Sequence, residues 1–247
     1  MKLAIQLYSV RDKMEADFFG TLEQLADLGY EGVEFAGLFG NDPEAVAAAC
    51  DRLGILPLSA HIGLGENWAD ELEAYAQVGC SYAVLPWLPE DVRPNAPDWE
   101  AGKKRISAYI NKADELGMKV LYHNHAFEFE PFEEGTLLDA IFAADDRMES
   151  ENDTCWTAVA GEDPCTYLQK FAGRAPLVHI KDYTLSEEGN VTFRPVGYGL
   201  QKLPELVTAA KNVGAMWLVV EQDAPDEGRG SVTCAALSAE ALKPLLG

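Results

Sequence analysis

The sequence predicts an α/β fold, a (β/α)8 or TIM barrel formed by a single domain over residues 1–247. Short apolar segments typical of buried parallel strands recur along the chain, and each precedes a longer segment whose apolar residues have helical spacing. Several helical segments end at a glycine just before the next strand. Eight such units in about 250 residues match this barrel, and an open doubly wound sheet is the main alternative.

The eight expected strands are short and apolar. They are Leu3–Tyr8, Gly32–Phe35, Leu56–Ala60, Tyr82–Leu85, Met118–Tyr122, Met148–Asn152, Leu177–Ile180 and Trp217–Val220. The expected helices are Phe18–Leu28, Pro43–Leu53, Trp68–Val78, Asp98–Leu116, Thr136–Ala144, Pro164–Phe171, Leu203–Val213 and Ser238–Leu246. Residues 86–97 and 182–199 are expected to form long loops over a site.

Glycines recur at the same place in the repeated strand–helix unit. Gly29, Gly54, Gly79, Gly117 and Gly214 each separate a helical segment from a strand, at the place where a left-handed helix cap is favoured. The first strand–helix turn has no GxGxxG fingerprint. This argues against a dinucleotide-binding sheet.

Composition limits the partners of the chain. It has 19 Lys and Arg against 41 Asp and Glu, a net charge of −22, which would repel nucleic acid and anionic membranes. The amino-terminal segment does not match a signal sequence, and no apolar run approaches the roughly 20 residues of a membrane helix. Five cysteines without a CxxC pair fit reduced thiols. We therefore expect a cytoplasmic protein that binds neither nucleic acid nor membranes.

Polar and aromatic residues follow the predicted strands where a barrel of this kind has its catalytic face. They include Tyr8, His61, Trp87, His123, His125, Glu128, Asp153, His179, Lys181 and Glu221. All four histidines of the chain are in this set, a distribution that random placement would rarely produce. A functional cluster is therefore favoured over four separately packed imidazoles.

Four of these residues have the donor types of a divalent-metal site. Glu128, Asp153, His179 and Glu221 follow four successive strands, and an oxygen-rich set with one imidazole suits magnesium, manganese or a related ion. The alternative is that the carboxylates are solvated in loops. Glu221 fits that alternative least, because it ends the apolar run WLVV, where an unpaired charge is costly.

The role of Lys181 is open between two options. It is expected either to pair with Asp182 or Asp153, which are close in sequence or follow a neighbouring strand, or to donate to a substrate oxygen. Trp87 and Trp156 could form apolar walls of a site, although large aromatic residues at barrel ends also serve as packing.

Taken together, the motifs resemble the sugar phosphate isomerase/epimerase group of xylose-isomerase-like TIM barrels. QLYSVRD, GYEGVEFAG, SAHIG, PWL, YHNHAFEF, DTCW, HIKD, GYG and VEQD occur in the family's order over nearly the whole chain. The resemblance implies a divalent metal (Mn, Mg, Co or Zn) bound by Glu128, Asp153, His179 and Glu221. Within YHNHAFEF, however, His123 or His125 could replace Glu128 as the ligand.

The resemblance also implies a reaction. In relatives that epimerise or isomerise sugars, two metal-bound glutamates exchange the proton next to a carbonyl, and here Glu128 and Glu221 would be that catalytic pair. The residues expected to contact a small carbohydrate substrate are Tyr8, His61, Trp87, His123, His125 and Lys181. The segment GYGLQKLPEL departs from many relatives after GYG, so its substrate contacts are expected to differ.

Several functions compete with the isomerase or epimerase hypothesis. A dehydratase (a lyase) of an inosose or keto-sugar would use the same metal and carboxylates. A non-catalytic sugar-binding barrel and an apurinic-site endonuclease are weaker alternatives, since binding does not need opposed carboxylates and the charge of −22 opposes DNA binding. The oligomeric state is open, with a homo-oligomer among the options.

Overall fold

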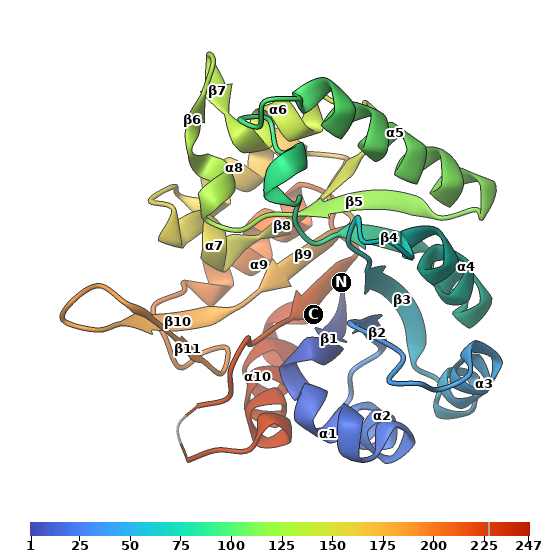
Figure 1. Cartoon of the computed structure of the whole chain (residues 1–247). Coiled ribbons are helices and arrows are strands. Elements are labelled where there is room, and N and C mark those ends of the chain that lie inside the picture. The colour runs from blue at the N-terminus through green and yellow to red at the C-terminus, as the bar shows by residue number, and fades with distance from the viewer. Residues whose placement is uncertain (227) are drawn as a thin grey trace.

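A computed structural model describes residues 1–226 and 228–247. Eight parallel strands close into a barrel in the order β1-β12-β9-β8-β5-β4-β3-β2, and helices surround it (Figure 1). The strands are β1 (Lys2–Gln6), β2 (Gly32–Phe35), β3 (Leu56–His61), β4 (Tyr82–Leu85), β5 (Lys119–His123), β8 (Glu149–Asp153), β9 (Leu177–Ile180) and β12 (Trp217–Val220). The predicted (β/α)8 barrel is confirmed.

The α-helices of the outer ring alternate with these strands. They are α1 (Arg11–Ala16), α2 (Phe18–Asp27), α3 (Pro43–Leu53), α4 (Trp68–Val78), α5 (Trp99–Glu115), α6 (Leu137–Phe142), α7 (Thr154–Val159), α8 (Pro164–Leu168), α9 (Leu203–Asn212) and α10 (Ser231–Leu246). Short 3-10 helices occur at Leu7–Val10, Glu90–Val92, Phe127–Phe129 and Gln169–Phe171. Among the described residues, no helix has the length and apolar character that a membrane crossing requires.

The glycines between helices and strands have the predicted conformation. Gly29, Gly54, Gly79, Gly117 and Gly214 all have φ between 66° and 99°, a left-handed region that a side chain disfavours. Each therefore ends its helix and turns the chain into the next strand.

Several predicted boundaries differ from the structure. The first strand ends at Gln6, because Leu7–Val10 turn into a 3-10 helix that carries Tyr8. The last helix begins at Ser231 instead of Ser238. The predicted loop 182–199 contains an antiparallel hairpin of β10 (Asp182–Leu185) and β11 (Val191–Arg194), which projects from the barrel in Figure 1. A second, smaller hairpin joins β6 (Pro131–Phe132) to β7 (Gly135–Thr136).

Apolar side chains fill the half of the barrel interior that lies away from the carboxyl ends of the strands, here called the lower half. Its buried side chains are Ala4, Leu58, Tyr82, Val84, Leu121, Leu177, Trp217 and Val219. A larger apolar layer between the strands and the helices surrounds the barrel. Because side chains of a strand alternate between faces, the inward residues two positions further along form the next layer. That layer is polar, and it holds the candidate site.

Candidate active site

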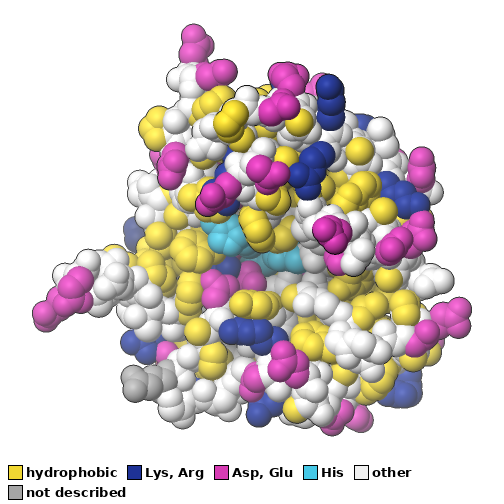
Figure 2. Space-filling view, in the orientation of Figure 1, with side chains coloured by type: hydrophobic (Ala, Val, Ile, Leu, Met, Phe, Trp, Pro, Cys, Tyr) yellow, Lys and Arg dark blue, Asp and Glu magenta, His cyan; other side chains and the backbone are white. Residues whose placement is uncertain are grey.

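A cleft of about 500 Å³ opens at the carboxyl ends of the strands. Its lining includes all six residues expected to contact a substrate: Tyr8, His61, Trp87, His123, His125 and Lys181. Glu221 and Asp223 also line it. Figure 2 shows histidine side chains at the bottom of this hollow, between acidic and apolar surfaces. The barrel thus brings side chains from most of its strands to one opening.

The upper cluster consists of His123, Asp153, His179 and Glu221. One ligand atom from each lies within 4.8 Å of the others, and all four residues are buried. Nδ1 of His179 is 3.1 Å from Oε2 of Glu221 and 3.8 Å from Oδ2 of Asp153. Three of the four predicted metal ligands therefore meet, each at the carboxyl end of its own strand.

Asp153 is held in place by its neighbours. Its Oδ1 caps helix α7 by accepting the backbone N–H of Trp156 at 2.8 Å, and its own backbone N–H donates to the side chain of Asn124 at 3.0 Å. Oδ2 is buried and accepts no hydrogen bond from the residues described, although the Lys181 ammonium group forms an ion pair with it at 3.3 Å. A buried carboxylate oxygen left in this state next to an imidazole and a second carboxylate suits a cation ligand.

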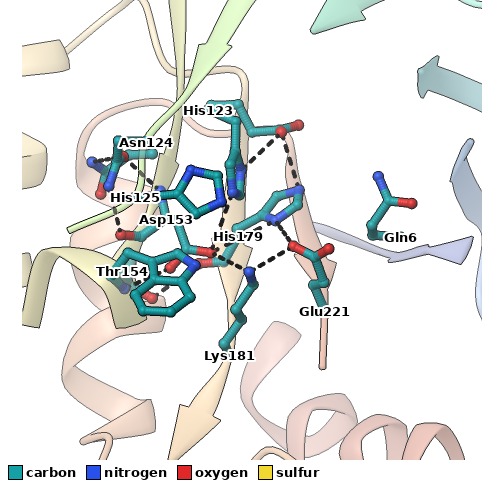
Figure 3. Close-up of polar contacts among 12 residues, drawn as sticks. Gln6, His123, Asn124, His125, Asp153, Thr154, His179, Lys181 and Glu221 are labelled. Atoms are coloured by element: carbon teal, nitrogen blue, oxygen red, sulfur yellow. Dashed lines mark hydrogen bonds and ion pairs between the residues drawn. The ribbon is translucent and has the colours of Figure 1, made fainter. Parts of the chain in front are cut away.

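Lys181 reaches into the same cluster, between Asp153 and Glu221 (Figure 3). Its Nζ is 2.8 Å from Glu221, 3.0 Å from Asp223 and 3.3 Å from Asp153. Burial lowers the pKa of Lys181, but these three carboxylates outweigh it and hold the pKa well above its usual value. Lys181 is consequently a buried ammonium group that partly neutralises the acidic side of the cleft.

Asp182 does not pair with Lys181. Its carboxylate accepts four backbone N–H groups, from Tyr183, Gly197, Gly199 and Gln201, at 2.9–3.0 Å. A Cβ on Gly199 would lie 2.2 Å from this carboxylate, which explains the glycine there. Asp182 therefore ties the GYG segment to the end of strand β9.

The deep cluster lies below the upper one and contains Glu34, His61, Glu151 and His179, with His123 beside it. Oε1 of Glu34 is 2.8 Å from Nε2 of His179 and 3.0 Å from Nε2 of His61. Oε2 of Glu151 is 3.1 Å and 2.9 Å from the same two nitrogens. Gln6 and Ser59 also donate to Glu34.

The carboxylates and imidazoles set each other's charge. Burial alone lowers the pKa of His61, but Glu34 and Glu151 raise it to about 10, and they also hold the pKa of His179 well above its usual value. Burial and the nearby cationic groups instead keep the pKa of His123 far below its usual value and lower that of His125 to about 3. His123 and His125 are thus neutral imidazoles.

Glu128 is not part of this arrangement, in contrast to its predicted role as a ligand and catalytic base. It lies on a 3-10 turn that folds back on the outer side of β5, where it accepts hydrogen bonds from the Tyr122 hydroxyl at 2.9 Å and the His125 backbone at 2.8 Å. Burial raises the pKa of Glu128 to about 7. From β5 it is His123 that lies with Asp153, His179 and Glu221 in a group of side chains able to hold a metal ion.

Two acidic residues of the deep cluster were not predicted as site residues. Glu151 belongs to the polar run ESEN, which resembles a solvated segment, although it lies two residues before Asp153 and so shares its strand face. Glu34 is the one charged residue of the strand Gly32–Phe35. The period of two along a strand is the signal that identifies both as inward-facing.

The fold and site define a (β/α)8 barrel with a buried carboxylate–imidazole cluster at its catalytic face. A family model described as xylose isomerase-like TIM barrel matches residues 22–243. The chain belongs to this family.

Curated and solved relatives are consistent with that assignment. The chain is 27% identical to the inosose dehydratase of Geobacillus kaustophilus over 65% of its own length and 60% of that protein's length. A sugar phosphate isomerase/epimerase from Parabacteroides distasonis is 23% identical over 100% of this chain and 95% of that chain, with a TM-score of 0.75. The IolI protein with a zinc atom is 17% identical over 100% and 98%, with a TM-score of 0.73. At these identities the two structures show a shared fold.

Proposed function

We propose that this chain is a divalent-metal-dependent lyase that removes water from a neutral keto-polyol or keto-sugar. Isomerisation or epimerisation of the same class of substrate is the second candidate. Both reactions begin by removal of a proton next to a carbonyl, and they differ in where the next proton goes. The position of Lys181, 2.8 Å from Glu221, is the observation that favours the lyase.

The metal would be held by Asp153, His179 and Glu221. Three protein ligands around an open position are typical of catalytic sites, and Oδ2 of Asp153, which accepts no hydrogen bond from the described residues, fits this role. A bound divalent ion would polarise the carbonyl and hydroxyl oxygens of the substrate. Zinc is found in the structure of the IolI protein, and manganese, magnesium and cobalt are equally compatible with such donors.

Glu221 is proposed as the base that takes the proton from the substrate carbon. Lys181 and His179 hold its carboxylate ionised, since they outweigh burial and lower its pKa. Lys181 donates a hydrogen bond to the substrate oxygen that leaves as water, and the proton that Glu221 takes from the carbon passes to that oxygen. Because acceptor and donor lie side by side, proton and hydroxyl leave from the same face of the substrate.

The opposite side of the cleft has an imidazole where a second carboxylate was expected. Epimerisation needs a group there that returns the proton to the other face of the carbon. His125 lines that side with its neutral ring against Trp156, and it is suited to orient a hydroxyl group. Glu128 points away from the cleft and accepts a hydrogen bond from Tyr122. A carboxylate (Glu221) on one side of the cleft and a neutral imidazole (His125) on the other therefore favour elimination.

A neutral substrate is favoured by the charges of the cleft. Lys181 is the only Lys or Arg side chain that lines it among the described residues, and three carboxylates already surround that ammonium. The imidazole of His61, which also lines the cleft, is paired with Glu34 and Glu151, so neither of these cationic groups is free to bind a phosphate group. The similarity to an inosose dehydratase agrees with a neutral cyclic polyol.

The test is turnover by metal-loaded protein of a panel of inososes and keto-sugars in deuterated water. Loss of the mass of one water identifies the lyase, and deuterium gain without mass loss identifies the isomerase or epimerase. Glu221→Gln is expected to lower either rate by about 10²–10⁴-fold, whereas the exposed control Glu240→Gln leaves it unchanged. Wild-type protein that turns over none of these compounds with any divalent metal would refute the proposal.

A further inference from the structure

The deep cluster holds more buried acceptors than the described residues can satisfy. Oε1 of Glu151 and Nδ1 of His123 are both buried and have no hydrogen-bond partner within residues 1–226 and 228–247. Glu151 is 0% exposed and His123 1% exposed. Buried polar atoms of this kind usually have a protein partner, an ordered water or an ion.

The imidazole of His123 faces both clusters with different atoms. Its Nδ1 lies 3.4 Å from Oε2 of Glu151, and its Nε2 lies 3.9 Å from Oδ2 of Asp153. In His179 the two nitrogens are reversed. Its Nδ1 faces Glu221 in the upper cluster, and its Nε2 faces Glu34 and Glu151 in the deep cluster. Figure 3 shows these two rings next to each other, above Lys181.

We propose a second divalent-cation site in the deep cluster, formed by His61, His123 and Glu151, whose ligand atoms lie within 4.8 Å of one another. It is distinct from the site that Asp153, His179 and Glu221 would form, and it does not depend on the proposed reaction. Two imidazoles and a buried carboxylate are donors that suit a zinc or cobalt ion.

The spacing of these three side chains fits such an ion, and Glu34 lies beside His61. Ligands bound at 2.0–2.1 Å in a tetrahedron stand about 3.3 Å apart. Nε2 of His61 is 2.9 Å from Glu151 and 3.0 Å from Glu34, and Nδ1 of His123 is 3.4 Å from Glu151. Both imidazole nitrogens therefore already stand near this spacing from the Glu151 carboxylate.

Sharing of the two histidines between the sites follows from their orientation. If His179 coordinates through Nδ1 in the upper site, its Nε2–H remains a donor to Glu34 and Glu151, a common arrangement around metal-binding imidazoles. His123 then serves the deep site through Nδ1. No imidazole has to bind two ions.

Charge balance also favours a deep cation. An imidazole bound to a metal is neutral, so an ion in the upper site would leave His61 as the one cationic partner of the buried Glu34 and Glu151. Buried carboxylates need full compensation. A divalent ion bound to neutral His61 and His123 balances both carboxylates.

The test counts metal ions in the purified full chain. Metal-free protein is titrated with Co²⁺ or Zn²⁺, dialysed and measured by elemental analysis, and the Co²⁺ form is followed by visible absorption. Wild type is expected to retain two ions per chain, and Glu151→Gln one. Asp153→Asn is also expected to retain one, but with the absorption spectrum of the deep ion instead of the upper one. Glu149→Gln, on the same strand and paired with Lys119, is the matched control and keeps two.

Circular dichroism shows whether Glu151→Gln folds. If it does not, His61→Asn removes another ligand of the deep site and replaces it in the test. It is also expected to retain one ion. One ion in wild type, or an unchanged number in both deep-site variants, would overturn the proposal. Two ions in wild type without turnover of any sugar would sink the proposed function and leave the deep site standing.

Discussion

The two halves of the barrel interior differ by a step of two residues along the same strands. In the lower half, Leu121, Leu177 and Val219 fill the barrel, and in the upper half His123, His179 and Glu221 take their places. Both layers are buried. The lower layer stabilises the fold by removing apolar surface from water, whereas the upper layer costs desolvation and is retained through pairing. The same strands thus carry both the layer that stabilises the fold and the layer that forms the candidate site.

Leu121→Ala tests the lower half. It removes a fully buried side chain from this half and is expected to lower the free energy of unfolding by about 2–5 kcal/mol. Turnover per folded molecule should change little, because His123 is positioned by the backbone of β5. Urea unfolding and specific activity measured on the same preparation check both statements.

Leu56→Ala is the control for this substitution. Leu56 lies at the start of β3 and is 45% exposed, so its truncation should cost far less. A large loss of specific activity in fully folded Leu121→Ala protein would contradict the separation of the two layers.

Glu128→Gln tests a buried carboxylate outside the barrel interior, for comparison with the paired carboxylates of the upper layer. Among the described residues, no cation is in hydrogen-bond contact with Glu128. Its folded-state pKa of about 7 lies above the ordinary value of 4.5. The folded state therefore binds more protons between these pH values, and the stability from this group, complete below pH 4.5, is lost as pH rises through about 7. The loss amounts to roughly 3 kcal/mol.

The measurement is the free energy of unfolding of wild type and Glu128→Gln at a series of pH values. The difference between the two proteins is expected to shift in favour of the variant as pH rises. Glu130→Gln, which removes an exposed carboxylate from the same segment, is the matched control. A difference that stays constant with pH would show that Glu128 does not titrate in this way.

The contrast between Glu128 and Glu221 shows what the sequence could predict. Glu221 directly follows an apolar strand, so the fold alone places it at the catalytic face. Glu128 lies five residues beyond the end of β5, and its direction depends on a 3-10 turn and on the Tyr122 hydroxyl, which only the tertiary structure reveals. Local pattern is reliable at strand ends and weak in the loops that follow them.

The deep cluster and the hairpin were missed for a related reason. Glu151 stands in a run of polar residues that has the composition of a solvated loop, but pairing between β5 and β9 makes it a central, buried strand. The hairpin β10–β11 has polar residues and a short turn within a segment that was expected to be a loop. In both cases strand pairing outweighs local composition.

Trp87→Ala addresses the rim, where the smallest effect is expected. The indole lines the cleft and is 47% exposed, so it adds little to folding, but it offers an apolar face to the ring of a bound sugar. Loss of that contact should weaken binding by roughly 1 kcal/mol, or about five-fold in KM, with kcat nearly unchanged. Trp87→Phe should recover most of it, because an aromatic face is retained. Steady-state kinetics with the substrate found in the panel measures the split, and a fall in kcat with constant KM would place Trp87 among the groups that act in the chemical step.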